Sequence, residues 1–140
     1  LVAAVEDPLT GERRLFEPQR LDDVRINTEA YWDTVIGAMN SVMQNVRGTA
    51  WAVGGNAPYR MAGKSGTAQV FSVAQEEEYD EDEIEERLRD HALFISFAPL
   101  DNPRIAVAVI VENGSSGSRV AAPIARAIMD EYLGYGDDAP

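Results

Sequence analysis

The residues of this chain whose types and spacing are best suited to chemistry are Gly63-Lys64-Ser65-Gly66-Thr67, which place an ammonium and two hydroxyls among glycines. A Gly-Lys-Ser run occurs in phosphate-binding P-loops, which also require a glycine five positions before the Gly-Lys pair. Here that position is Pro58, and β-favouring residues follow instead of a helix whose N-terminus would face a phosphate. The sequence therefore disfavours a nucleotide-binding site at Lys64.

The same residue types suit the edge of a β-sheet that binds an extended peptide. Residues 60–71 end in β-favouring side chains, and glycines within a strand indicate close approach of another backbone. A lysine and a hydroxyl beside such a glycine can hold a terminal carboxylate. A backbone N–H at the same place can help to stabilise a tetrahedral oxyanion. The alternative interpretation is an ordinary glycine-containing strand near a turn.

The flanking residues favour the peptide-binding interpretation. Lys64-Ser65-Gly66 resembles the Lys-[Ser/Thr]-Gly element of the serine penicillin-recognising enzymes, and the run from Tyr59 to Val70 resembles the corresponding strand of class B penicillin-binding proteins. The resemblance extends over nearly the whole chain, and downstream it is to the Gram-negative members. It includes Tyr31-Trp32, Gly48-Thr49-Ala50, Arg87-Leu88-Arg89-Asp90-His91, Phe97-Ala98-Pro99 and Val111-Glu112-Asn113-Gly114.

The resemblance implies roles for four residues of this motif. Lys64 would assist proton transfer and orient the serine of a middle Ser-x-Asn box, so Lys64 and Thr67 are the candidate catalytic residues. Ser65 and Thr67 would bind the substrate carboxylate, and the N–H of Thr67 would form half of an oxyanion hole. Gly66 would keep the strand open to substrate. The candidate substrate-binding set is therefore Lys64, Ser65, Gly66 and Thr67.

The nucleophile of such an enzyme is not in this sequence. Lys64 is the only lysine, and Met61 stands where a Ser-x-x-Lys box would need its serine. A serine nucleophile requires such an activating partner within hydrogen-bond reach. In the family both boxes precede this region, so we expect residues 1–140 to be the C-terminal portion of a transpeptidase domain that packs against the remaining N-terminal part. None of the serines has Asn or Asp two positions later: Ser41, Ser65, Ser72, Ser96, Ser115, Ser116 and Ser118.

Apolar spacing predicts the elements that precede the motif. Residues 1–16 are expected to form a hairpin around Pro8 and Gly11. Asn27-Thr28 predicts a helix N-cap, and the helix would end near Gly48. Residues 48–59 are interpreted as a loop. The helix carries an apolar stripe that we interpret as core packing: Trp32, Val35, Ile36, Met39, Val42, Met43 and Val46.

Strands are predicted over 60–71, 93–99 and 104–112, with a hairpin between the last two because Asp101-Asn102-Pro103 is turn chemistry. A helix is predicted over 120–133, with Pro123 in its first turn. Residues 72–90 would form an acidic inter-strand loop, since nine of the eleven residues from Glu76 to Glu86 are acidic. A short helix within it would be supported by the i,i+4 pairs Glu83–Arg87 and Glu85–Arg89. By resemblance the fold is α+β, sandwich-like: the C-terminal part of the serine penicillin-recognising fold, an antiparallel sheet flanked by helices.

Composition limits the other function classes. A net charge of −12 disfavours a nucleic-acid surface. With no cysteine and His91 as the only histidine, a metal site is not expected, and His91 is expected to be structural. No run of about eighteen apolar residues is present to span a membrane. The chain begins at Leu1 without an initiator Met, which we interpret as the inside of a larger protein.

The resemblance implies a peptidoglycan D,D-transpeptidase that cross-links cell-wall stem peptides through a serine acyl-enzyme, without a cofactor. β-Lactams would acylate the same serine, and a membrane glycosyltransferase of the elongation machinery would be a partner. The complete protein would lie on the periplasmic side of the inner membrane, anchored by an N-terminal helix that this chain lacks. The chain alone is expected to be inactive. A non-catalytic penicillin-recognising sensor or binding module remains open as an alternative.

Overall fold

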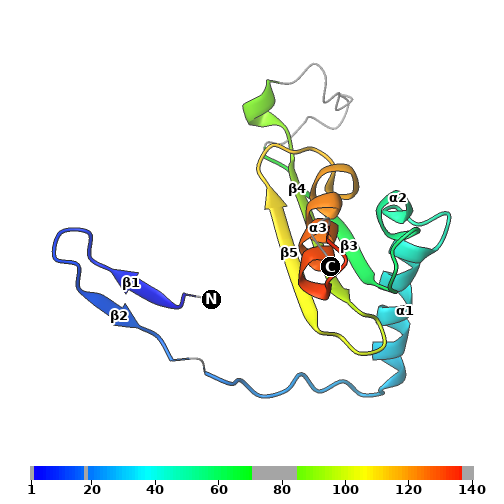
Figure 1. Cartoon of the computed structure of the whole chain (residues 1–140), viewed down its shortest axis with the longest axis horizontal. Helices are drawn as coiled ribbons and strands as arrows, with labels where there is room; N and C mark the ends of the chain where they lie inside the picture. The colour runs from blue at the N-terminus through cyan, green and yellow to red at the C-terminus, as the bar shows by residue number, and fades with distance from the viewer. Residues whose placement is uncertain (1, 18, 71–84, 137–140) are drawn as a thin grey trace.

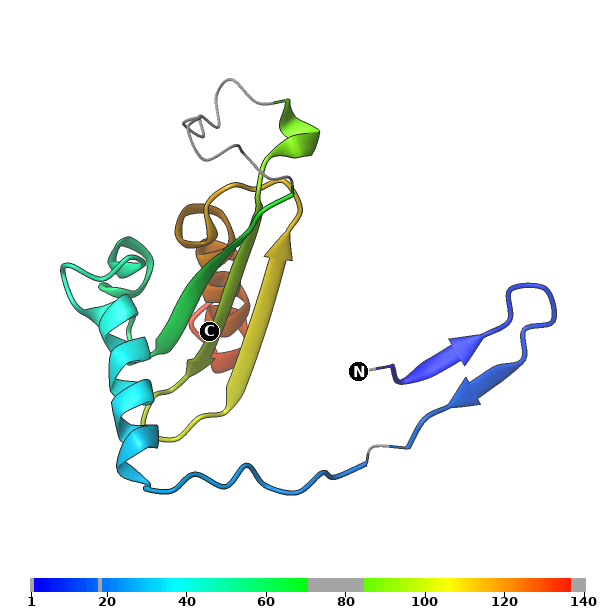
Figure 2. The same ribbon diagram turned by 180° about the vertical axis from the view of Figure 1, so that it is seen from behind.

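The structure is a computed structural model that describes residues 2–17, 19–70 and 85–136. Its body is a three-stranded antiparallel sheet with helices packed against it, so the fold is mixed α+β as expected (Figures 1 and 2). The strands are β3 (Ala62–Ala68), β4 (His91–Ala98) and β5 (Ile105–Val111). Their order is β3-β4-β5, which makes β3 an edge strand.

The three strands overlap the ranges 60–71, 93–99 and 104–112 in which the sequence predicts them. The predicted hairpin between β4 and β5 is confirmed, with Ala98 opposite Ile105. Residues 71–84, which include most of the predicted acidic loop, lie outside the described residues. The predicted short helix is a single 3₁₀ turn, η1 (Glu86–Leu88), in which Glu85 pairs with Arg87 at 2.6 Å and not with Arg89.

One face of the sheet is covered by α3 (Ala122–Leu133) and by the π-helical turn η2 (Gly117–Ala121) that leads into it (Figure 1). Pro123 lies in the first turn of α3, where its missing N–H removes no helical hydrogen bond. Small side chains on this helix allow it to lie close to the strands. The core contains apolar side chains that are at most 1% exposed: Met43, Ala50, Met61, Ala92, Phe94, Ala98, Ala121, Ala122, Ala125 and Met129.

The other face of the same sheet is largely uncovered by the described residues. Side chains alternate between the two faces along a strand. Phe94 on the covered face is 1% exposed, whereas its neighbour Ile95 is 53% exposed and Ile110 of β5 is 66% exposed. A shallow hollow of about 300 Å³ lies on this open face, lined by Met39 and by residues of β4 and β5.

The helix before the motif differs from its prediction in two respects. α1 (Ala30–Gln44) contacts β3, but of its predicted apolar stripe only Met43 is fully buried, and Trp32 remains 46% exposed. The interpretation of the whole stripe as core packing is wrong, because no described element covers the outer side of α1. The N-cap is Glu29, whose side chain makes no capping hydrogen bond, so the predicted cap is also wrong. Part of the predicted loop is a one-turn helix, α2 (Trp51–Gly54).

The predicted N-terminal hairpin is present and lies apart from the main sheet in both views (Figures 1 and 2). It pairs β1 (Ala4–Glu6) with β2 (Arg13–Leu15). The carboxylate of Asp7 accepts hydrogen bonds from the N–H groups of Leu9 at 2.8 Å and Thr10 at 3.1 Å. These bonds favour the charged form and lower the pKa of Asp7. The hairpin is therefore closed by local turn bonds rather than by packing.

The loop after β5 is connected to the segment that leads into β4. Asn113 has a positive φ of 55°, and its side-chain amide donates hydrogen bonds to the carbonyls of Arg87 at 3.0 Å and Arg89 at 2.9 Å. Its backbone N–H donates to Nδ1 of His91 at 2.9 Å. His91 therefore has the structural role that the sequence suggests.

Candidate substrate-binding strand

The Lys64-Ser65-Gly66-Thr67 motif lies in the middle of β3, the edge strand. β3 pairs with β4 along one side, and no other described strand pairs with its second side. An edge strand presents backbone N–H and C=O groups to which an extended chain can pair. The motif therefore lies where the peptide-binding interpretation requires it.

The motif side chains alternate across the sheet. Lys64 is opposite Ile95 and shares the open face with it, whereas Ser65 and Thr67 point to the side of Phe94, toward α3. Lys64 and Thr67 are exposed, and Ser65 is partly exposed. The ammonium of Lys64 donates a hydrogen bond to the carbonyl of Ser65 at 2.6 Å. The four predicted residues therefore share one stretch of edge strand, but their side chains do not converge on one point within this chain.

The glycines of this region differ in why they are needed. A Cβ at Gly63 would lie 2.8 Å from the ring of Phe94, so internal packing excludes a side chain there. A Cβ at Gly66 would meet only the Cβ of Leu93, at 3.3 Å. A Cβ at Gly117, the first residue of η2, would collide with the carbonyl oxygens of Leu93 and Gly66. The backbone of Gly66 is thus in close contact with Gly117 of η2, while space for a Cβ at Gly66 itself is only slightly restricted.

Residues 59–61, which we call the β3 root, attach the strand to its surroundings. The carbonyl of Met61 accepts a hydrogen bond from the side chain of Asn40 in α1 at 2.8 Å. The carbonyl of Arg60 accepts one from the N–H of Leu100, in the turn after β4, at 2.8 Å. These bonds fix the backbone just before the first buried residue of the strand, Ala62.

Tyr59, the first residue of the β3 root, is bonded to α3. Its hydroxyl donates a hydrogen bond to Asp130 at 2.7 Å, and Arg126 donates to both carboxylate oxygens of Asp130 at 2.7 Å. Arg126 also donates to the carbonyl of Val53 at 2.8 Å and lies over the Tyr59 ring. Burial and the bond to Asp130 raise the pKa of Tyr59 well above its ordinary value, so its hydroxyl stays protonated at neutral pH.

The cluster of Tyr59, Asp130 and Arg126 is not predicted by the sequence pattern. The spacing of Arg126 and Asp130 is the helical i,i+4 pattern, which would have indicated a pair on one face of the final helix. Their link to Tyr59 spans 71 positions of sequence and has no local signal.

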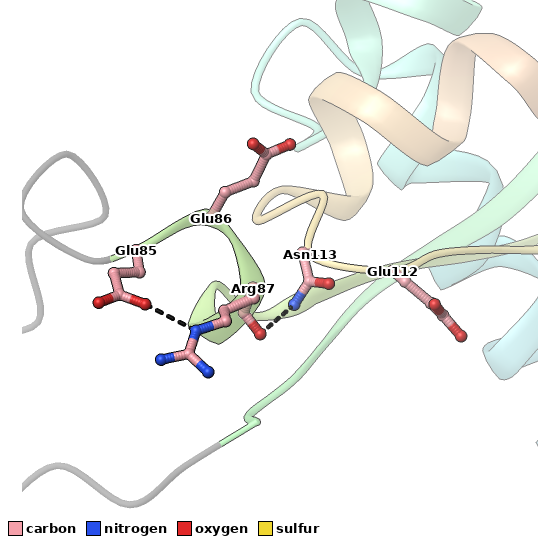
Figure 3. A pocket seen from close by; sticks show the side chains of 5 residues that line it. All are labelled: Glu85, Glu86, Arg87, Glu112 and Asn113. Carbon is pink, nitrogen blue, oxygen red and sulfur yellow. Dashed lines mark hydrogen bonds and ion pairs between the residues drawn. The ribbon is translucent and has the colours of Figure 1, made fainter.

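A separate hollow of about 480 Å³ lies near the N-terminal end of β4, where Asn113 reaches the carbonyl of Arg87 (Figure 3). It is lined by three glutamates together with Arg87 and Asn113, and it contains no motif residue. No group of three or more His, Asp or Glu residues among those described is arranged to hold a metal ion. Within the same described part, none of the helices has the length and apolar character needed to cross a membrane.

Comparison with known proteins places the chain in a family. Residues 1–130 match the model of the penicillin binding protein transpeptidase domain. The chain is 43% identical over 117 residues to the peptidoglycan D,D-transpeptidase MrdA of Haemophilus influenzae, covering 84% of this chain and 18% of that protein. It is 45% identical over 108 residues to MrdA of Escherichia coli K12, covering 77% of this chain and 17% of that protein. The chain thus spans less than a fifth of the length of these relatives.

Solved structures agree with this assignment. The crystal structure of Pseudomonas aeruginosa PBP2 in complex with WCK 5153 is 44% identical, with a TM-score of 0.70 over 89% of this chain and 24% of that one. Helicobacter pylori PBP2, in its complex with MreC, is 26% identical, with a TM-score of 0.60 over 76% of this chain and 18% of that one. The chain belongs to the penicillin-binding protein transpeptidase domain family and is similar to part of MrdA, the PBP2 of Gram-negative bacteria.

Proposed function

We propose that residues 1–140 are the C-terminal portion of a peptidoglycan D,D-transpeptidase domain and supply its substrate-binding strand. The observation that carries this proposal is the position of Lys64-Ser65-Gly66-Thr67 on an edge strand with exposed Lys64 and Thr67, in a chain of the transpeptidase family. A stem peptide ending in D-Ala-D-Ala would lie antiparallel beside β3. Main-chain pairing of this kind provides affinity, and neighbouring side chains provide selectivity.

The motif residues have distinct proposed roles. The hydroxyls of Ser65 and Thr67 bind the terminal carboxylate of the stem peptide, and the charge of Lys64 attracts the same group. Gly66 keeps the strand backbone accessible. The N–H of Thr67 donates one of two hydrogen bonds to the oxyanion of the tetrahedral intermediate. Lys64 also assists proton transfer by orienting a serine of the middle box. Its side chain lies on the open face of the sheet.

The nucleophilic serine and its activating lysine come from residues outside this chain, because no Ser-x-x-Lys sequence is present in it. In the proposed reaction the serine oxygen attacks the carbonyl carbon of the penultimate D-Ala. Terminal D-Ala leaves with a proton, and an acyl-enzyme ester remains. An amine of a neighbouring stem then attacks the ester, forms the cross-link and returns the proton to the serine. β-Lactams would acylate the same serine.

The proposed setting follows from the relatives. Helicobacter pylori PBP2 forms a complex with MreC. We infer that the protein carrying this chain works with the cell-elongation machinery, including a membrane glycosyltransferase, on the periplasmic side of the inner membrane. An anchoring helix would lie in sequence outside this chain.

Labelling with a fluorescent penicillin tests the proposed function. The chain alone should take no covalent label, whereas a protein that also contains the residues encoded upstream of Leu1 should be labelled. Lys64→Ala should reduce labelling of that longer protein by about 100-fold or more, as is typical when a group acting in proton transfer is lost. Arg104→Ala is the matched control, because Arg104 is also an exposed cation but lies in the connection that leads into β5, away from the motif.

Two outcomes would contradict the proposal. Covalent labelling of the isolated chain would show that a nucleophile exists within residues 1–140. A longer protein that binds penicillin reversibly but is never acylated would favour the non-catalytic sensor or binding module instead.

A further inference from the structure

The β3 root is hydrogen-bonded to three separate elements of the fold. Each of its three consecutive residues bonds to a different element: Tyr59 to α3, Arg60 to the turn after β4, and Met61 to α1. A β-strand advances about 3.3 Å per residue, so the last of these attachments lies only about 10 Å from Lys64. A displacement of the root is therefore passed along the strand to the motif.

Among these attachments only the bond of Tyr59 joins two side chains, those of Tyr59 and Asp130. A third side chain, Arg126, bonds to Asp130 in turn. Asp130 is only 21% exposed and Arg126 only 17%, and Nε of Arg126 donates to both oxygens of the Asp130 carboxylate at 2.7 Å. Arg126 then reaches the carbonyl of Val53 in α2, so a single cluster connects α2, the β3 root and α3. Partly buried, charge-assisted bonds of this kind define geometry more strictly than exposed ones.

The η2 turn that leads into α3 contacts the motif directly. η2 continues into α3, and its first residue, Gly117, lies against the backbone of Gly66 so closely that no Cβ would fit between them. The unit of η2 and α3 therefore makes two contacts along this segment, with Tyr59 in the β3 root and with Gly66 in β3. Two contacts at different points along the segment restrict both the distance of the strand from the helix and its angle to the helix.

We propose that Tyr59, Asp130 and Arg126 are positioning residues. They hold β3 in the position relative to α3 at which Lys64 and the N–H of Thr67 can act on substrate. This inference rests on the proposed transpeptidase function. The bonds of the cluster join α2, α3 and the β3 root, and none of its three residues belongs to the Lys64–Thr67 motif. Its effect on the reaction comes through the placement of the strand.

The expected loss of acylation rate in Tyr59→Phe can be estimated from the effect of misplacing a reacting group. Misplacement of a reacting group by about 1 Å can cost about 100-fold in rate. Loss of one of three attachments should allow a smaller shift, so Tyr59→Phe should slow acylation by about 5- to 10-fold. The loss should appear mainly in the rate at saturating penicillin. The oxyanion bond from Thr67 acts most strongly in the transition state, so the apparent affinity should change by no more than about 2-fold.

The experiment uses the longer protein that contains the upstream residues, with a fluorescent penicillin at several concentrations and a parallel measurement of Tm. Tyr59→Phe removes only the hydroxyl, and Asp130→Asn keeps the side-chain shape while removing the charge. The double variant should be no more than about 2-fold slower than the slower single variant, because both changes disrupt one cluster. Tyr135→Phe is the matched control, since its ring lies 5.4 Å from that of Tyr59 and the described residues offer its hydroxyl no hydrogen bond.

The outcomes separate this inference from the proposed function. If Tyr59→Phe and Asp130→Asn lower Tm but acylate at the unmodified rate well below Tm, the cluster is only stabilising and the inference is wrong. If Tyr59→Phe does not fold, the rate of Asp130→Asn decides the question. An unmodified longer protein that takes no label would overturn the proposed function, and this inference would fail with it.

Discussion

The two faces of the three-stranded sheet contrast strongly although they are made by the same strands. On one face Ala92, Phe94 and Ala98 are buried beneath α3 and η2. On the other, Ile95 and Ile110 are more than half exposed. The residues are comparably apolar on both sides. Burial here is therefore decided by which elements lie over the sheet, and not by the residue types in its strands.

The composition of β5 suits a sheet that is covered on both faces. A strand covered on one side usually alternates apolar and polar residues, whereas an uninterrupted apolar run is typical of a strand covered on both sides. β5 is such a run, from Ile105 to Val111. An exposed apolar area of this kind marks an interface. We therefore expect the open face to pack against the rest of the transpeptidase domain, and the following predictions test that difference between the faces.

The largest expected effect comes from truncating adjacent residues on opposite faces. Phe94→Ala should lower the free energy of unfolding by about 3–5 kcal/mol, because it leaves a cavity beneath α3. Ile95→Ala should cost less than about 1 kcal/mol in the chain alone, since its side chain is half exposed. In the longer protein we expect Ile95→Ala to cost about 2–4 kcal/mol. Urea unfolding measures all three, and an Ile95 cost that stays below about 1 kcal/mol in the longer protein would mean that the open face is not covered.

A smaller effect is expected where η2 meets the sheet. Gly117→Ala should lower the free energy of unfolding by about 1–3 kcal/mol, because a Cβ there overlaps the backbone of Leu93 and Gly66. Gly37→Ala is the control. Nothing lies within 4 Å of a Cβ at Gly37, which is in the interior of α1, so this change should stabilise the protein by about 0.5–1 kcal/mol. Thermal unfolding distinguishes them, and a neutral Gly117→Ala would show that η2 is not pressed against the strands.

The smallest effect concerns the pH dependence of the covered face. The raised pKa of Tyr59 means that the folded state holds this proton more tightly than the unfolded state does. Its contribution to stability is complete below about pH 10, the unfolded value for tyrosine, and is lost as the pH rises further. Between pH 9 and 11 the unmodified protein should lose a few tenths of a kcal/mol more than Tyr59→Phe, because solvent screens a partly exposed ring. Equal slopes in chemical unfolding across this range would mean that folding does not raise the pKa of Tyr59.

The sequence was sufficient to place strands but not to say what covers them. Runs such as Leu93 to Ala98, bounded by turn residues, leave few choices of conformation, so β4, β5 and their hairpin were predictable. The exposed side of α1 was not, since an apolar helical stripe has the same spacing whether or not a partner is present. The four-residue helix α2 was missed because so short a segment is stabilised by neighbours and not by propensity.

In the candidate site, too, one part could be predicted from the sequence and another could not. The motif could be located because its residue types are few and contiguous. The attachments of the β3 root could not, because Asn40, Leu100 and Asp130 are distant in sequence from the residues they bind. Such contacts depend on how the elements pack, which a local pattern does not contain.

Asn113 has a consequence for how natural variation in this family should be interpreted. Its positive φ favours Gly, Asn or Asp, and its two amide donors, which hold the carbonyls of Arg87 and Arg89, exclude Gly and Asp. Substitution at this position is therefore restricted by backbone conformation and by donor count at once. Both restrictions follow from the connection that Asn113 makes to the segment before β4, which begins at His91.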